Sequence, residues 1–334
     1  MTALSAGELA YNLRRDGDME RLALGLGCVF ELLVTSACWS VGITPGGGGA
    51  TPNDSGPAET NVTTLATGRY LPQYLAVDEA SVYWMDLDGT VAKVPVGGGD
   101  VETLATDGGE PWGLAVDSVN VYWTSGTDVF RVLLTGGPTE TVASTLSFPT
   151  SIVASNGVVF GTDYFADTVF RVDSTGGSAI AVASDQPGPS SLALEGSTLY
   201  WVDTCNDLQC KPQSELVAEA LTGGVATTLA TSVPSPISLA VNDDNLYWAD
   251  AQAIMRLPLS GGTPLTLART IAKRIAADAT GVYWTTGSSL LRTDPTGGHI
   301  ATLASTVTSY AIALDDRNVY WSELNPGKIL RVSK

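Results

Sequence analysis

The chain has 334 residues, of which 44% are hydrophobic and only 16% charged, and it contains 36 glycines and 17 prolines. This composition suits many short strands joined by tight turns and argues against long helices. The formal net charge of -18 at pH 7 makes nucleic acid and anionic membrane surfaces poor partners for the body of the protein.

The N-terminal sixty residues differ in composition from the rest. Residues 22–38 form an apolar run that ends in small residues. Residues 39–60 contain a Gly-, Pro-, Ser- and Asp-rich stretch that cannot bury enough apolar surface to fold. Together these features predict an export signal over 1–38, with Met19 as an alternative start, followed by a flexible linker over 39–60.

The tetrapeptide TSAC at 35–38 resembles a bacterial lipobox, in which the cysteine is lipidated and becomes the mature N-terminus. We therefore expect Cys38 to carry lipid and to anchor a periplasmic or cell-surface lipoprotein through the linker. Simple cleavage after Ala37, and hence secretion, is the alternative. A membrane-spanning segment is disfavoured because the apolar run is short and contains Glu31.

A sequence repeat occupies the remainder of the chain, residues 61–334. The aromatic residue that ends the second strand of each unit recurs at intervals of 39, 37, 41, 47, 36 and 37. Such a period is typical of a solenoid or a propeller, and four strand signals per unit favour a β-propeller with four-stranded blades. The aligned aromatic positions are Trp84, Trp123, Phe160, Trp201, Trp248, Trp284 and Trp321.

The two ends of the repeat region complement each other. The seventh unit stops after its third strand, at 328–332, whereas residues 61–66 look like a fourth strand with no blade before it. Pairing of these segments would close the ring and remove the exposed sheet edges. We therefore predict an all-β fold, a seven-bladed β-propeller of four-stranded blades whose last blade is closed by the N-terminal strand 61–66. We expect a monomer.

Charged residues recur at equivalent positions of the units, which favours structural roles over a single site. The carboxylates that end the first strands are expected to be turn residues. The basic residues of the third strands are expected to pair between blades with the carboxylates of the second strands. The carboxylates are Asp78, Asp117, Glu195, Asp278 and Asp315, and the basic residues are Lys93, Arg131, Arg171, Arg256, Arg292 and Arg331.

The second strands carry the letters YWT at 122–124 and 283–285, and in four units an Asp follows the strand. These strands resemble the YWTD propeller repeat, and residues 61–334 are similar to exported bacterial propellers of that kind. The resemblance implies that these residues support the blades, that ligands bind on a face, and that no universal catalytic group is supplied. The four acidic residues are Asp86, Asp163, Asp203 and Asp250.

Candidate catalytic chemistry is sparse. Seven-bladed bacterial lyases that act on cyclic peptide antibiotics resemble this chain in outline, but they use paired His and Glu, and His299 is the single histidine here. The segment DLDG at 86–89 lacks the further oxygen ligands that calcium requires. We assign no catalytic residue, metal ligand or cofactor. A metal-dependent hydrolase or lyase that uses carboxylates at the central channel is the alternative function.

Two cysteines, Cys205 and Cys210, flank a short insertion in the longest unit. In an oxidising compartment this spacing predicts a disulfide that staples the loop. A zinc site is disfavoured because it needs more ligands than two sulfurs and no histidine lies nearby.

The residues that precede each first strand are expected at the mouth of the central channel, where a rigid scaffold concentrates binding groups. Large side chains occur there in four blades that are consecutive once the ring is closed. Cations at one end and aromatic rings along the rest suit an anionic or carbohydrate ligand. The alternative is that the aromatic side chains fill the channel and the cations only neutralise neighbouring Asp residues. The predicted arc contains Gln73, Tyr74, Trp112, Lys273, Arg274 and Tyr310.

The leading hypothesis is therefore a non-catalytic binding or scaffold propeller displayed outside the cytoplasm. Its ligand would be a protein, a peptide or a carbohydrate, and its contact with the membrane would be through the lipid anchor alone.

Overall fold

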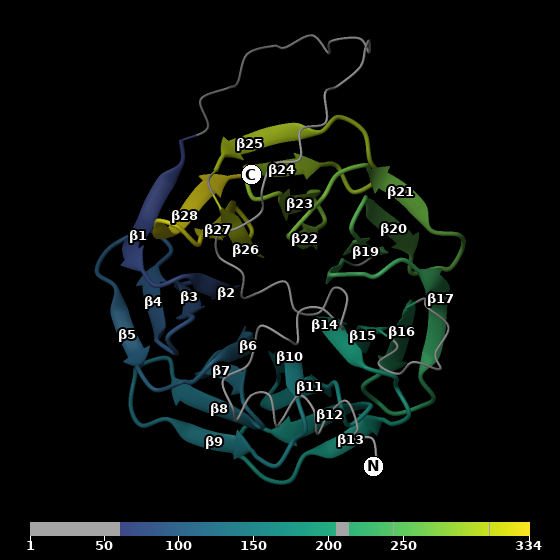
Figure 1. The fold of residues 1–334 in the computed structure, drawn as a ribbon, viewed down its shortest axis with the longest axis horizontal. Helices are drawn as coiled ribbons and strands as arrows, with labels where there is room; N and C mark the ends of the chain where they lie inside the picture. The colour runs from purple at the N-terminus through teal and green to yellow at the C-terminus, as the bar shows by residue number, and fades with distance from the viewer. Residues whose placement is uncertain (1–60, 205–213, 243, 307) are drawn as a thin grey trace, which may run out of the picture. The chain divides into compact units, whose positions relative to one another are not determined.

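The computed structural model describes residues 61–204, 214–242, 244–306 and 308–334. In these segments the chain forms seven four-stranded antiparallel sheets, arranged as the blades of a propeller (Figure 1). The first strand of each blade is innermost and the fourth is outermost. The described part of the chain offers no helix long and apolar enough to cross a membrane. The predicted fold is confirmed.

The strands of blades one to six follow chain order within each sheet. Blades one to three contain β2 (Pro72–Val77), β3 (Ser81–Asp86), β4 (Val91–Pro95), β5 (Glu102–Ala105), β6 (Pro111–Val116), β7 (Asn120–Ser125), β8 (Asp128–Leu133), β9 (Glu140–Ala143), β10 (Pro149–Ser155), β11 (Val158–Asp163), β12 (Thr168–Asp173) and β13 (Ile180–Ala183). Blades four to six contain β14 (Pro189–Glu195), β15 (Thr198–Asp203), β16 (Ser214–Ala220), β17 (Thr227–Val233), β18 (Ser238–Val241), β19 (Asn245–Ala249), β20 (Ile254–Pro258), β21 (Leu265–Ala268), β22 (Arg274–Asp278), β23 (Gly281–Thr285), β24 (Ser289–Thr293) and β25 (Ala301–Ser305). Blade seven contains β26 (Ser309–Leu314), β27 (Asn318–Glu323), β28 (Gly327–Ser333) and β1 (Thr63–Arg69).

Blade seven joins the two ends of the propeller. Its outermost strand, β1, pairs antiparallel with β28, so that Thr63 lies opposite Arg331 and Arg69 opposite Gly327. The predicted closure is therefore confirmed, and β1 extends three residues beyond the predicted segment 61–66. At the close approach of the two strands, the position of Gly327 leaves no room for a side chain, because a β-carbon there would collide with the Arg69 carbonyl.

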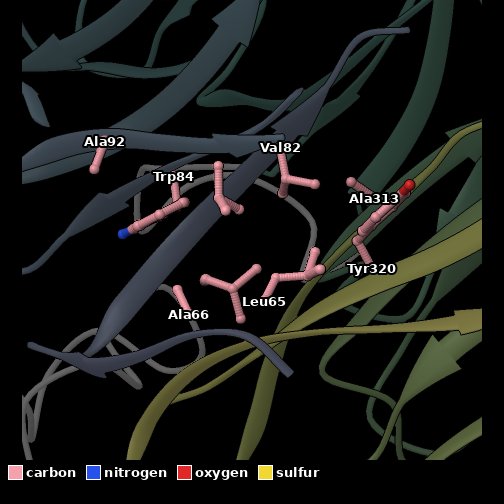
Figure 2. Packing of buried hydrophobic residues seen from close by; sticks show 9 residues of the cluster. Leu65, Ala66, Val82, Trp84, Ala92, Ala313 and Tyr320 are labelled. Atoms are coloured by element: carbon pink, nitrogen blue, oxygen red, sulfur yellow. The ribbon is translucent and has the colours of Figure 1, made fainter. Parts of the chain in front are cut away.

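The Tyr-Trp pair of each second strand lets a blade pack on both of its faces. Trp84 of β3 belongs to a buried cluster at the boundary with blade seven, which also contains Leu65 and Tyr320 (Figure 2). The neighbouring Tyr83 points to the other face and packs against Trp123 of blade two. Because adjacent strand residues point to opposite faces, a tyrosine followed by a tryptophan fills two inter-blade layers at once. Truncation of one such buried ring to alanine costs about 3–5 kcal/mol.

The third blade departs from the sequence alignment, which placed Phe160 at the tryptophan position. In the structure Phe160 lies opposite Val153 and takes the tyrosine position, whereas Gly161 takes the tryptophan position, opposite Phe170 of β12. The Phe170 ring occupies the space beside Gly161 so closely that a β-carbon there would collide with it. The aromatic ring of this layer is thus supplied by the third strand.

Four of the five carboxylates predicted as turn residues at the ends of first strands have this role. Asp78 Oδ1 accepts the backbone N–H groups of Ala80 and Ser81 at 2.8 and 2.7 Å. Asp78 Oδ2 accepts the Tyr83 hydroxyl at 2.8 Å, which couples the turn to the buried ring. The same turn bonds recur at Asp117, Asp278 and Asp315.

For four of the six third-strand cations the predicted partners are wrong. Lys93 donates to the Leu134 carbonyl of the next blade, and its carboxylate partner is Glu102 on the fourth strand of its own blade, at 3.2 Å. Lys93 lies opposite Tyr83, whereas the second-strand carboxylate Asp86 lies three residues further along that strand. The cation therefore meets the neighbouring blade at a backbone carbonyl. Equivalent inter-blade bonds join Arg131 to Ser174, Arg256 to Pro295 and Arg331 to Val96.

Candidate functional site

The two faces of the propeller carry different connections. First strands begin where second strands end, since Pro72 at the start of β2 lies opposite Asp86 at the end of β3. We call this side the start face. The opposite side, the turn face, carries the turns after the first strands and the paired glycines of the hairpins between third and fourth strands, such as Gly98 and Gly99 with φ of 91° and 143°.

Three residues of the predicted arc meet at the start face, although each comes from a different blade. Arg274 begins β22, Tyr310 lies in β26 and Tyr74 lies in β2. Arg274 Nη2 donates to the Tyr310 hydroxyl at 2.9 Å, and its guanidinium carbon lies 4.6 Å from the centroid of the Tyr310 ring. The guanidinium also lies close enough to Tyr74 for its positive charge to lower the pKa of that hydroxyl. Blades six, seven and one are thus joined through one arginine.

The arginine is held by neutral groups. Arg274 Nη1 donates to the Lys273 carbonyl at 2.9 Å, in addition to the two tyrosine contacts. Within the described segments, its guanidinium forms no ion pair with a carboxylate. The cation is therefore preorganised, and its charge is not cancelled by a salt bridge in that part of the chain. This arrangement differs from the alternative in which the cations only neutralise aspartates.

Burial keeps the neighbouring tyrosine neutral. It raises the pKa of Tyr74 well above the ordinary value, and the Tyr310 hydroxyl and the Glu110 carboxylate add to the rise. The nearby positive charge of Arg274 opposes the shift. Tyr74 therefore stays protonated at physiological pH and is available as a hydrogen-bond donor and acceptor.

Trp112 belongs to a second group of residues, which we call the aromatic cluster: Trp112, Phe148, Tyr164 and Phe165. The Trp112 ring meets Phe148 edge-on at 4.8 Å, and Phe165 lies 5.2 Å from both Phe148 and Tyr164, measured between ring centroids. Phe148 and Tyr164 are buried, whereas Trp112 and Phe165 are half-buried. Blades two and three thus present two partly exposed rings on a buried aromatic base.

Asp163 fixes the loop that supplies the centre of the aromatic cluster. Its Oδ1 accepts the Phe148 backbone N–H at 2.7 Å and its Oδ2 accepts the Ser147 backbone N–H at 2.8 Å. The carboxylate is buried, so these two bonds replace its hydration and hold the loop against β11.

The remaining predicted site residues have other roles or lie outside the description. Gln73 is buried next to Tyr74. Lys273 is half-buried, and its backbone N–H donates to the Thr285 carbonyl at 2.6 Å. The predicted lipidation and disulfide residues, Cys38, Cys205 and Cys210, lie outside the described residues.

Sequence reasoning missed four residues near the arc, namely Glu110, Phe148, Tyr164 and Phe165. A signal for two of them exists in the sequence, because only the third unit has an aromatic pair, in DYFADT at 163–168, directly after its second strand. Phe148 precedes a first strand by one residue and falls outside the two positions that defined the arc.

Carboxylates are present on the start face but are dispersed. In the part of the chain that the structure describes, no three His, Cys, Asp or Glu side chains come together in a way that could hold a metal ion. Burial raises the pKa of Asp203 to about 7, and the charges of Glu215 and Asp167 add to the rise. Its hydrogen-bond partner is the Trp201 indole N–H, at 3.0 Å. His299 is exposed in the hairpin between β24 and β25, on the turn face.

Comparison with known proteins supports the fold. No protein-family model matches the sequence, and no curated protein matches it. Virginiamycin B lyase from Staphylococcus aureus is 16% identical with a TM-score of 0.66, covering 83% of this chain and 99% of that one. YCF48 bound to D1 peptide is 13% identical with a TM-score of 0.62, covering 84% and 99%. A chain of the nidogen/laminin complex is 19% identical with a TM-score of 0.54, covering 64% and 89%.

At these identities the likeness shows the β-propeller fold alone. The fold of the lyase and of the nidogen chain nevertheless fits the two resemblances that the sequence suggested, to seven-bladed lyases and to YWTD-type propellers.

Proposed function

We propose that this protein is a binding or scaffold propeller that holds its ligand at the start face. The observation that carries the proposal is the convergence of Arg274, Tyr310 and Tyr74 from three blades, with the cation bonded to neutral groups at 2.9 Å. Such a rigid, charged site is suited to recognition, because little side-chain entropy remains to be lost on binding. The aromatic cluster on the adjoining blades extends the surface that a ligand can contact.

We further propose that the protein is displayed outside the cytoplasm, with lipid on Cys38 and a disulfide between Cys205 and Cys210. Support comes from the sequence, in which TSAC precedes a stretch rich in Gly, Pro, Ser and Asp and two cysteines flank one insertion.

The propellers of similar fold include proteins seen with macromolecular partners, namely the nidogen/laminin complex and YCF48 with D1 peptide. These examples support a protein or peptide ligand as one class to test here. One of the structures of similar fold is a variant of virginiamycin B lyase in which a histidine is replaced by alanine, and this variant is described as catalytically inactive. The single histidine of this chain, His299, is exposed on the turn face, so the lyase likeness does not favour an enzymatic function here.

The first prediction tests this function with the full-length chain. We expect at least one member of a panel of peptides and oligosaccharides to bind the wild type. The triple variant Lys273→Ala, Arg274→Ala, Trp112→Ala should bind the same ligand with an affinity at least about tenfold lower. Isothermal titration calorimetry measures the affinities.

The matched control removes the same two charges from exposed positions on the turn face, Arg171→Ala with Arg317→Ala, and should bind like the wild type. If no panel member distinguishes the arc variant from the wild type, the start-face residues serve packing and the proposed function is wrong.

A further inference from the structure

The charged end of the site favours a carboxylate. Arg274 has five N–H donors, and the described residues give it two acceptors, both neutral: the Lys273 carbonyl and the Tyr310 hydroxyl. A guanidinium held in one orientation by such contacts matches the planar, bidentate geometry of a carboxylate. In a chain with a net charge of -18, this local positive charge would select an anionic group of small size over a polyanion.

The aromatic end favours an apolar side chain over a sugar ring. Sugar hydroxyls need hydrogen-bond partners beside the stacking ring, and several oxygen atoms near the aromatic cluster already have partners of their own. Both oxygens of Asp163 accept backbone N–H groups, and the hydroxyls of Thr150 and Thr162 bond each other at 3.0 Å. The half-buried rings of Trp112 and Phe165 therefore offer apolar contact area on a base that is fixed by Phe148.

The two ends of the site are separated along the ring. Arg274 begins a strand of blade six and Trp112 lies in blade two, with blades seven and one between them in the order of the ring. A ligand that reaches both ends must therefore span more than one blade.

Resting on the proposed function, we infer that the ligand is a short peptide that places one carboxylate on Arg274 and one aromatic or large aliphatic side chain against Trp112 and Phe165. The carboxylate can come from a C-terminus or from an acidic side chain, because both present the same group.

The experiment titrates the full-length chain with blocked Gly/Ser peptides of four to eight residues that carry one Phe near the N-terminus and a free C-terminal carboxylate. We expect one length to bind, and replacement of the Phe by Ser to weaken it at least about tenfold. Amidation of the C-terminus should weaken binding by a similar factor. Adding a Glu at the C-terminal end of the amidated peptide should restore binding if Arg274 also accepts a side-chain carboxylate. If binding is not restored, the carboxylate that Arg274 recognises is that of a C-terminus.

Protein variants locate the two contacts. Arg274→Gln should lower the affinity for the free-acid peptide at least about tenfold, and amidation of the peptide should then have no further effect. Phe165→Ala should likewise abolish the difference in affinity between the Phe peptide and the Ser peptide. Arg171→Gln and Ile180→Ala, at exposed positions of blade three outside the site, are the controls for charge and apolar area. Thermal unfolding of each variant verifies that it is folded.

The outcomes separate the two proposals. A neutral oligosaccharide that binds in an Arg274- and Trp112-dependent manner, with no peptide binding, overturns the peptide inference and supports the proposed function. Peptide binding that survives Arg274→Gln overturns the carboxylate contact. If neither class of ligand distinguishes the triple arc variant from the wild type, both proposals are wrong.

Discussion

Two acidic residues at the ends of equivalent second strands show how neighbouring side chains set the pKa of a buried carboxylate. Asp86 accepts the Arg69 Nε–H at 3.0 Å, whereas the side-chain donor to Asp203 within the described region is the Trp201 indole N–H, at 3.0 Å. Burial raises the pKa of both, to about 6 for Asp86 and about 7 for Asp203. A nearby cation limits the rise at Asp86, and neighbouring carboxylates increase it at Asp203.

The second prediction concerns pH at Asp203. Its folded-state pKa of about 7 lies above the ordinary value of 3.8, so between these values the folded protein binds a proton that the unfolded chain releases. The contribution of Asp203 to stability is therefore lost as pH rises, by about 2–3 kcal/mol between pH 5 and pH 8. Asp203→Asn should remove this part of the pH dependence, as measured by urea unfolding.

Asp100→Asn is the control, because it removes the same charge from an exposed side chain and should leave the slope with pH unchanged. An Asp203→Asn variant whose stability falls as steeply with pH as the wild type would contradict the assignment.

At the scale of the strands, side chains that lie opposite one another on adjacent strands form a row across each blade. In blade one, Ala76 lies opposite Tyr83, which lies opposite Lys93. The small alanine sits on the innermost strand, where blades converge, and the cation on the third strand reaches the next blade. Because the tyrosine hydroxyl also bonds Asp78 in the turn, local turn chemistry and inter-blade packing depend on one ring.

The third prediction concerns β11, where Gly161 and Phe170 replace the usual pairing of a tryptophan with a smaller residue. Gly161→Trp alone should destabilise the protein by about 1–3 kcal/mol, because the new ring collides with Phe170. Gly161→Trp with Phe170→Val should recover much of this loss, because it recreates the pair formed by Trp201 and Val217 in blade four. Denaturant midpoints measure both.

Phe170→Val alone is the matched control and should be destabilising, because it leaves a cavity beside Gly161. If the double variant is no more stable than Gly161→Trp, then Phe170 does not fill the space that a tryptophan at position 161 would occupy.

At the scale of the whole molecule, the ring has one joint in which strands from opposite ends of the repeat region meet. β1 covers the edge of β28, and Arg69 at its end reaches Asp86 of blade one. Leu65 and Ala66 of the same strand pack on Trp84 (Figure 2). The joint therefore combines backbone pairing, an ion pair and apolar packing.

The fourth prediction tests this joint by truncation. Removal of residues 1–69 should expose the edge of β28 and lower the melting temperature or prevent folding, because pairing and packing are lost together. Removal of residues 1–60 leaves all of β1 in place and should change the melting temperature little. Melting is followed by circular dichroism. Equal melting temperatures of the two truncations would show that β1 is dispensable.

The number of blades, the order of their strands and the closure by β1 were predictable from the sequence, because they depend on local strand patterns repeated at a regular spacing. The same regularity located Arg274, Tyr310 and Tyr74 at one face, since each holds an equivalent place before or within a first strand. Tertiary structure alone decided how these residues meet one another, because their contacts join three blades that are distant in the chain.

Three features could not be predicted from the sequence, each for a different physical reason. The acceptors of the third-strand cations are backbone carbonyls, which every residue possesses and no side-chain pattern marks. The ring beside Gly161 comes from the adjacent strand, so the space is filled without the expected residue. Phe148 reaches Trp112 because Asp163 folds its loop inward through two backbone bonds, an orientation that residue spacing does not specify.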